Sequence, residues 1–225
     1  MRNKDFNQQK AIHRTNELLS TKGLPGTYDL SLAKTVFDSI INSPDTYSSI
    51  PFPKYDSSLC EGEGDRSEDD IQTQTPIDIF ILQGWTLGFD PLPTNRLEKI
   101  YTSAQVSNEK PYFVKFPLDS LSTVNHMLAG IDSTIYGYFN VFVRFDPHDL
   151  DCVRGWLDGV KIGEATAVDE GKVSEQVDSI TRRYLAAYEL WSGRATEGMS
   201  AGGWKGRTLC MEIGGGTEVM SVEFS

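Results

Sequence analysis

Two cationic side chains and two glycines lie close together in an acidic stretch of the chain. Lys54 lies in the segment PKYDSS (53–58), and Arg66 ends the segment GEGDR (62–66). Cationic side chains bind carboxylates and phosphates, and glycines let backbone amides approach such an anion. The local positive charge therefore predicts a site for a small anionic metabolite. The alternative is an ordinary acidic surface loop, in which Arg66 only pairs with a neighbouring carboxylate.

A second segment that could carry chemistry is PIDIFILQGW (76–85). Its apolar run, Ile77–Leu82, is typical of a strand covered on both faces, and open α/β sheets bind ligands at the carboxyl ends of such strands. The run ends at Gln83, where a phosphate-transferring protein usually has a carboxylate beside its metal. Since an amide is a poorer magnesium ligand, no catalytic residue or metal ligand is assigned. The alternative is a buried strand that ends in a tight turn, with Trp85 covering the core.

Other candidate sites are not supported by the sequence. The cysteines and histidines are too scattered to predict a zinc site or a disulfide framework: Cys60, Cys152, Cys210, His13, His126 and His148. No Gly-Lys-Ser or Gly-Lys-Thr occurs in the chain, and Gly171-Lys172-Val173 is predicted to be an ordinary loop. The segment GMSAGGWKG (198–206) predicts a flexible connection, because no strand precedes it and no capped helix follows it.

Composition limits the class of protein. The chain has 225 residues and a net charge of −11, so it repels nucleic-acid backbones and anionic membrane surfaces. An apolar share of 39% is too high for a disordered chain and predicts a folded domain. No apolar run approaches the roughly 20 residues of a transmembrane helix, and the polar start, Met1–Gln9, does not resemble a secretory signal. The expected compartment is the cytoplasm.

The elements that must position these residues alternate between helices and strands, which predicts an α/β class. Helices are expected at 1–20 and at Leu118–Leu128. Another is expected to begin at Asp29 or Ser31, either of which can cap it, and to end at Ser43-Pro44. A further helix is expected after Ser174, its cap, with an apolar stripe that continues to Tyr188. Strands are expected at Ile77–Leu82, at Tyr136–Phe145, and in a hairpin of Leu209–Ile213 and Val219–Phe224 around three glycines. The acidic stretch Ser57–Thr75 is predicted to be an exposed loop.

Four segments match the patterns of one known family in the same order. They are GLPGTYDLSL (23–32), PKYDSSLCEGEGDR (53–66), PIDIFILQGWTLGF (76–89) and EQVDSITRRYLAAYELW (175–191). The family patterns are GxPGTHD, PxYDKSxxxGxGDR, DxxxxEGWxxGF and GYxPAYELY. The chain resembles the glycerate-kinase-like ATP-dependent kinases of fungi and plants, which are P-loop kinases near uridine kinase and phosphoribulokinase. Agreement of several separated motifs is much more specific than agreement of one.

The resemblance implies a fold and a function. The fold is a P-loop-kinase (Rossmann-like) parallel sheet flanked by helices, in a single α/β domain over residues 1–225. The function is transfer of the γ-phosphoryl group of ATP, with magnesium, to a small hydroxylated metabolite such as glycerate. By position, the resemblance implies that Tyr55, Asp56, Asp65 and Arg66 lie on the acceptor-substrate side and that Gln83 lies at the metal side of the second nucleotide motif. Lys54 is added to the acceptor side because of its local positive charge.

The chain also departs from the family pattern. It lacks the opening strand and the G-x-x-G-x-G-K-[ST] loop, so the domain is expected to be incomplete at its amino terminus. Ser57 replaces the Lys of YDKS, Gln83 replaces the Glu of EGW, and Trp156–Lys161 lacks the Arg of WRLQQEH. Each departure removes a charge that phosphoryl transfer uses. ATP and magnesium are therefore implied by the resemblance only, and neither is expected to bind tightly to this chain.

Three functional hypotheses follow from the sequence. The first is an ATP-dependent kinase-like protein that acts on a small anionic metabolite, with no nucleic-acid or membrane partner. The second is a catalytically inactive kinase-like protein that binds a metabolite or a partner through GEGDR. The third is a truncated remnant without a stable fold.

Overall fold

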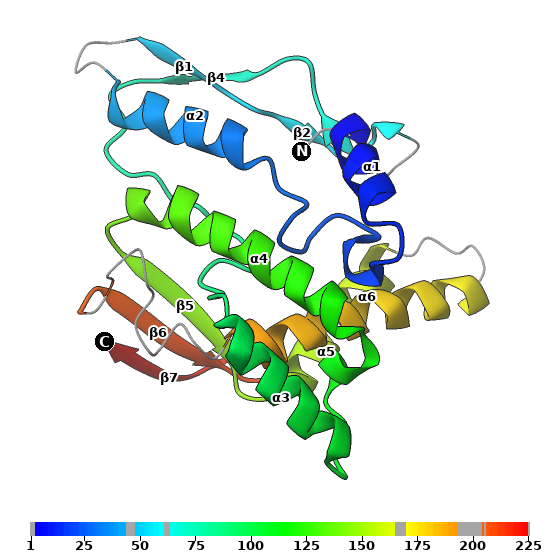
Figure 1. Cartoon of the computed structure of the whole chain (residues 1–225). Coiled ribbons are helices and arrows are strands. Elements are labelled where there is room, and N and C mark those ends of the chain that lie inside the picture. The colour runs from blue at the N-terminus through cyan, green and yellow to red at the C-terminus, as the bar shows by residue number, and fades with distance from the viewer. Residues whose placement is uncertain are drawn as a thin grey trace.

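The computed structural model describes residues 3–43, 48–60, 64–164, 170–192, 204 and 206–224 (Figure 1). Its helices are α1 (Asn3–Ile12), α2 (Leu30–Ile41), α3 (Thr94–Val106), α4 (Leu118–Ile135), α5 (Leu150–Glu164) and α6 (Glu170–Trp191), with short 3-10 turns η1 (Glu17–Leu19), η3 (Tyr112–Lys115) and η4 (Tyr136–Tyr138). Its strands are β1 (Ser49–Phe52), β2 (Tyr55–Asp56), β3 (Asp65–Arg66), β4 (Ile71–Gln74), β5 (Phe142–Pro147), β6 (Thr208–Ile213) and β7 (Val219–Phe224).

The predicted helices are present, but some of them begin or end at other residues than predicted. Asp29 caps α2, because its carboxylate accepts a hydrogen bond of 3.0 Å from the amide of Leu32. The last helix begins at Glu170 rather than after Ser174, so Gly171-Lys172-Val173 lies within α6 and is not a loop. The segment Gly198–Gly206 lies mostly outside the described residues.

The strands form three small sheets. β1 pairs with β4 and β2 pairs with β3, both antiparallel. β5 and β6 are parallel, and β7 is antiparallel to β6, so the predicted carboxy-terminal hairpin is confirmed. The acidic stretch predicted as a loop contains β3 and β4. In Figure 1, α4 runs between α2 with its β1–β4 ribbon and the β5–β6–β7 sheet, which is the α/β arrangement that the sequence predicts.

The strand predicted at Tyr136–Phe145 begins later than expected. Tyr136 ends the long helix α4 and is buried there. Its hydroxyl accepts a hydrogen bond of 3.0 Å from the amide of Gly88 and donates one of 3.3 Å to the carbonyl of Phe89. Because these contacts hold Tyr136 in the core, the chain becomes extended only after η4, and β5 starts at Phe142.

The segment Ile77–Leu82 is not a strand in this structure, which corrects the sequence prediction. It pairs with no strand of the described chain, although its side chains alternate as in a strand. Phe80 and Leu82 pack against the core, whereas Ile79 and Ile81 are 79% and 82% exposed. A strand needs a neighbour to pair its backbone groups, and the alternating pattern alone does not supply one.

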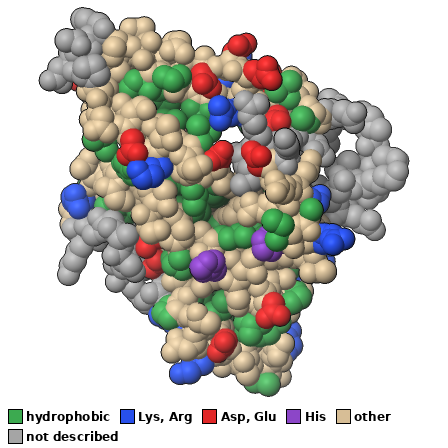
Figure 2. Space-filling model, turned by 45° about the horizontal axis from the view of Figure 1, so that its top comes forward, with side chains coloured by type: hydrophobic (Ala, Val, Ile, Leu, Met, Phe, Trp, Pro, Cys, Tyr) green, Lys and Arg blue, Asp and Glu red, His purple; other side chains and the backbone are tan. Residues whose placement is uncertain are grey.

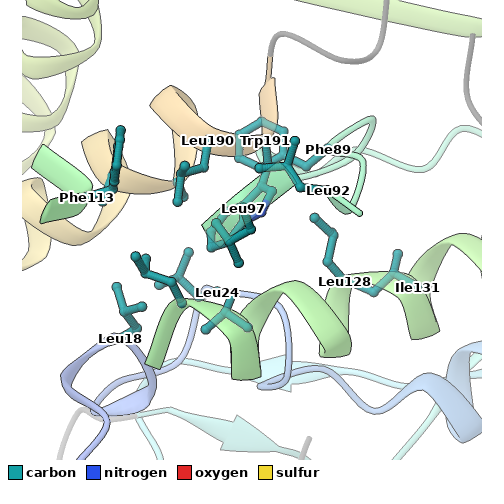
Figure 3. Packing of buried hydrophobic residues seen from close by; sticks show 14 of the residues in the cluster. Leu18, Leu24, Phe89, Leu92, Leu97, Phe113, Leu128, Ile131, Leu190 and Trp191 are labelled. Carbon is teal, nitrogen blue, oxygen red and sulfur yellow. The ribbon is translucent and has the colours of Figure 1, made fainter. Parts of the chain in front are cut away.

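The core lies where α6, α4 and α3 meet. Figure 3 shows Leu190 and Trp191 of α6, Leu128 and Ile131 of α4, and Leu97 of α3 around one apolar centre. No helix in the described ranges is both long and apolar enough to span a membrane.

One buried amide side chain links three parts of this core. The Oδ1 atom of Asn125, on α4, accepts hydrogen bonds from the amide of Leu92 at 2.8 Å and from the Nε1 atom of Trp191 at 2.9 Å. Its Nδ2 atom donates to the carbonyl of Leu92 at 2.8 Å. Since an unpaired amide in an apolar core is costly, these bonds fix the relative position of the three segments.

The exposed apolar residues of Ile77–Leu82 predict self-association of the purified chain. Unpaired extended backbone beside Ile79 and Ile81 can pair with another molecule. Ile81→Lys is expected to lower the associated fraction in sedimentation velocity, with the free energy of unfolding changed by less than about 0.5 kcal/mol. Val106→Lys, at an equally exposed position at the end of α3, is the control and should have no such effect. A monomeric native chain with cooperative unfolding would contradict this expectation.

Candidate functional site

The first and third segments of the family pattern converge on the second half of α6, which carries the fourth. The ring of Tyr184 on α6 lies 4.1 Å from that of Trp85, centroid to centroid. Its hydroxyl also lies against Gly23, so close that a Cβ at Gly23 would be 2.8 Å from it. The amide of Asp90 donates to the carbonyl of Trp191 at 3.3 Å. Segments that are far apart in the sequence therefore share one support.

The first segment is a turn fixed by hydroxyl groups. The Oγ1 atom of Thr27 accepts from the amide of Gly23 at 2.9 Å and donates to the carbonyl of Leu24 at 2.7 Å. Tyr28 donates its hydroxyl proton to the carbonyl of Gly23, and its oxygen lies 2.9 Å from the Oγ1 atom of Thr86. Burial raises the pKa of Tyr28 to about 12, so the phenol stays protonated and joins the first segment to the third.

The second segment folds back on itself as a short hairpin. In it, Tyr55 is the register partner of Arg66 and Asp56 that of Asp65, so four of the five predicted acceptor-side residues come together. Lys54 is exposed, and its carbonyl accepts from the amide of Ser67 at 2.8 Å. Gly62 and Glu63, which also belong to this segment, lie outside the described residues.

The two carboxylates of the hairpin hold its backbone. Asp56 accepts from the amide of Ser58 at 2.9 Å and from its hydroxyl at 2.6 Å, and these bonds lower the pKa of Asp56. Asp65 accepts from the amide of Arg66 at 2.7 Å. The guanidinium of Arg66 forms no ion pair with a described carboxylate, and its Nε atom is buried without a hydrogen-bond partner in the described chain. Its side chain therefore retains a donor that an acceptor oxygen could use.

Sequence reasoning missed Lys22, which reaches this hairpin from the first segment. Its Nζ atom donates to the carbonyl of Gly64 at 2.8 Å and lies 5.8 Å from the centre of the Tyr55 ring. The contact spans 42 residues of sequence, so no local pattern indicates it. The only available signal was the position of Lys22 directly before the GLPGTYD segment.

The residues that the structure describes do not fit the phosphates of a nucleotide with magnesium. Gln83 is exposed and makes no hydrogen bond to another described residue. No group of three His, Cys, Asp or Glu side chains in the described ranges could hold a metal ion. The sequence has no Gly-Lys-Ser or Gly-Lys-Thr, the motif whose backbone amides and lysine bind these phosphates.

A further carboxylate, Glu189, lies where α6 packs on η3. Its Oε2 atom accepts from the amide of Phe113 at 3.0 Å. Burial raises the pKa of Glu189 to about 7, against the opposing effects of that hydrogen bond and of Lys115. Glu189 is half-buried on the helix that supports the site, and none of its described contacts is with the hairpin residues.

Gly64→Ala should disrupt the hairpin. Gly64 has φ +73°, and a Cβ there would lie 1.9 Å from the hydroxyl of Tyr55. We expect a loss of about 1–3 kcal/mol in the free energy of unfolding, or faster amide exchange confined to the hairpin. Gly155→Ala, on α5 where a Cβ meets nothing within 4 Å, is the control and should be neutral or slightly stabilising. Unchanged stability together with unchanged exchange in Gly64→Ala would contradict the hairpin geometry.

Glu189→Gln should change how stability depends on pH. The folded-state pKa of Glu189 lies above its ordinary value of 4.5, so the native chain is favoured at low pH and loses stability as pH rises through about 7. Because the side chain is only half-buried, we expect Glu189→Gln to be more stable than the native chain at pH 8 by at most about 1 kcal/mol, and equal to it near pH 5. Urea unfolding at both values measures this, with the exposed Glu98→Gln as the charge control. Equal effects of the two substitutions at pH 8 would refute it.

Comparison with known proteins identifies the relatives of this chain. The probable ATP-dependent kinase TDA10 of Saccharomyces cerevisiae is 28% identical over 191 residues, which are 79% of this chain and 58% of that protein. The chloroplastic D-glycerate 3-kinase of Arabidopsis thaliana is 25% identical over 178 residues, 78% of this chain and 35% of that protein. No protein-family model matches the chain.

The fold is shared with a solved structure over the whole chain. The D-glycerate 3-kinase of Cryptococcus neoformans superimposes with a TM-score of 0.84 and 28% identity, covering 100% of this chain and 76% of that one. The chain thus spans a little over half the length of its yeast relative and about a third of its plant relative. The P-loop-kinase-like α/β fold is confirmed by this superposition, and the chain is similar to the glycerate-kinase-like proteins of fungi and plants.

Proposed function

We propose that this chain takes part in the phosphorylation of a small hydroxylated acid of the glycerate type, and that the β2–β3 hairpin is its acceptor side. The observation that carries the proposal is the hairpin register, which places Arg66 opposite Tyr55 with a buried, unpartnered Nε atom. A guanidinium with a donor to spare is suited to bind a carboxylate. The names of the relatives, which are all kinases, favour this function over that of a non-catalytic binding protein.

The residues of the hairpin divide into two chemical kinds. Arg66 and the exposed Lys54 bind the carboxylate of the acceptor, the first through paired donors and the second as a point charge. Asp56, whose low pKa keeps it ionised, and Asp65 accept hydrogen bonds from the acceptor's hydroxyl groups. A hydroxy acid presents both kinds of group, whereas a simple anion presents only one.

The nucleotide side of the reaction does not come from the residues described above. ATP belongs to this proposal because the yeast relative is named an ATP-dependent kinase, and magnesium because phosphoryl transfer commonly uses it. The sequence has no Gly-Lys-Ser or Gly-Lys-Thr, the motif whose amides and lysine hold the β and γ phosphates. We therefore assign the described residues a role in binding the acceptor and none in transferring the phosphoryl group.

The expected partners follow from charge. On the face that Figure 2 displays, Lys and Arg side chains lie singly among acidic ones, which does not suit a nucleic-acid backbone or an anionic membrane surface. A cytoplasmic location remains a prediction, with which the three free thiols of Cys60, Cys152 and Cys210 agree.

Binding of D-glycerate tests the proposed function. We expect D-glycerate at millimolar concentration to raise the melting temperature, and D-lactate, which has the same configuration and one hydroxyl fewer, to do so less. The acid without the second hydroxyl is the matched control for the roles of Asp56 and Asp65. If neither D-glycerate nor any other small hydroxy acid shifts the melting temperature, acceptor binding by this chain is wrong.

Titration with ATP and magnesium should give no binding at micromolar affinity. The reason is the absence from the sequence of a loop that supplies both backbone amides and a lysine to the phosphates. Isothermal titration calorimetry of the full chain measures this directly. A dissociation constant in the low micromolar range would mean that another segment binds the nucleotide.

A further inference from the structure

We propose that Lys22 is a further cation of the acceptor site, in addition to Arg66 and Lys54, that it binds the carboxylate of the acceptor together with Arg66, and that Arg183 positions it. This inference rests on the proposed function, because it takes the β2–β3 hairpin to be the acceptor side. It assigns roles in that function to two residues from outside the hairpin, Lys22 and Arg183. It also names the contacts through which α6 fixes the geometry of the site.

The first step is the place of Lys22 beside the hairpin. Its Nζ atom uses one donor on the carbonyl of Gly64, which leaves two of the three donors of an ammonium. The same atom lies 5.8 Å from the ring centre of Tyr55 and 5.9 Å from that of Phe6. The two aromatic rings and the carbonyl hold the cation at the hairpin, and none of them neutralises its charge.

The second step concerns the relation of Lys22 to Arg66. Tyr55 and Arg66 are register partners, so their side chains lie on the same face of the hairpin, with Cβ atoms about 5 Å apart. The ring of Tyr55 is therefore a neighbour of both cations. In the described chain neither Lys22 nor Arg66 forms an ion pair, and Arg66 has its buried Nε atom without a partner. Two neighbouring cations favour an anion beside them.

The third step is the support of Lys22 from α6. Arg183 is only 3% exposed, and its Nη1 atom donates to the Oγ atom of Ser20 at 3.0 Å and to the Oγ1 atom of Thr21 at 2.7 Å. Its Nε atom donates to the carbonyl of Ser179 at 3.2 Å. The two residues directly before Lys22 are thus bound to one buried guanidinium.

The residue after Lys22 is fixed by the same helix. Gly23 has φ +129° and lies against the hydroxyl of Tyr184, the next residue after Arg183, where a Cβ would not fit. The backbone on both sides of Lys22 is therefore held by adjacent residues of α6. A lysine ammonium lacks the Nε donor that Arg183 places on the carbonyl of Ser179, so it cannot make all three of these bonds in the same geometry. Because these bonds go to α6 and to Ser20 and Thr21, Arg183 acts on the site through position and not through contact with the acceptor.

The test compares an anionic and a neutral ligand on matched variants. The probes are D-glycerate and its neutral amide, glyceramide, titrated calorimetrically into the full-length native chain and into Lys22→Met, Lys22→Arg and Lys99→Met. Lys99 is an exposed cation on α3 and controls for the change in net charge. We expect Lys22→Met to weaken D-glycerate about tenfold and glyceramide little, Lys22→Arg to restore most of the affinity, and Lys99→Met to have no effect.

A purely structural role for Lys22 gives a different pattern. If Lys22 only tethered the hairpin, Lys22→Met would weaken both ligands equally, and that result overturns the proposal. Native affinity of Lys22→Met for D-glycerate overturns it too, while leaving the proposed function intact. For Arg183, we expect Arg183→Lys to reduce the same preference for the anion over the amide. An unchanged preference in a folded Arg183→Lys refutes the positioning role, and Thr21→Val, which removes one of the two hydroxyls, tests that role if Arg183→Lys does not fold.

Inorganic phosphate separates failure of this inference from failure of the function. If the native chain binds no hydroxy acid but binds phosphate, and Lys22→Met loses that binding, then the two-cation site stands and the proposed acceptor is wrong. If the native chain binds neither D-glycerate nor phosphate, both proposals are wrong.

Discussion

Burial of the last three turns of α6 is the constraint on which the rest of this structure depends. Leu185, Ala186, Ala187 and Trp191 are fully buried there. Two adjacent alanines let other segments approach the helix closely, and the large ring of Trp191 fills the centre of the core. The helix must therefore be covered on several sides at once. The segments that cover it bring the GLPGTYD turn, Trp85 and the loop before α3 into one place, which is why motifs far apart in the sequence meet here.

The β2–β3 hairpin is attached to this core much more loosely than the motifs around α6. It has two residues in each strand, and its link to the first segment includes a single hydrogen bond from Lys22 to Gly64. A short element with few tertiary contacts opens at low free energy cost, as ligand-binding loops commonly do. The arrangement combines a buried support, where Arg183 and Tyr184 hold the chain on both sides of Lys22, with a hairpin that has few bonds to the core.

The sequence predicted the features that depend on neighbouring residues and missed those that depend on distant ones. Asp29 and the apolar stripe that follows it define α2 locally, and the glycines between β6 and β7 define the hairpin. Ile77–Leu82 has the composition of a strand, but a strand also needs a neighbouring strand to pair with, and the sequence pattern does not show whether there is one. Tyr136 looked like the start of a strand because its hydrogen bonds to Gly88 and Phe89 are invisible in the sequence. The pairing of Tyr55 with Arg66 and the reach of Lys22 to Gly64 are equally non-local.

The two sides of a kinase site need not depend on each other physically, and this chain separates them. The groups that suit an acceptor lie on a hairpin and on a turn whose support is α6, and none of their hydrogen bonds described above involves Ile77–Leu82 or the free edge of β5. The segment that ends in Gln83 has no strand partner in the described chain, and its last residue is an amide where the family pattern has a carboxylate. Because the core around Trp191 is complete without that partner, the support of the proposed acceptor groups does not depend on a strand at Ile77–Leu82. The proposed acceptor binding and the proposed phosphoryl transfer therefore call for separate measurements, which an activity assay alone does not provide.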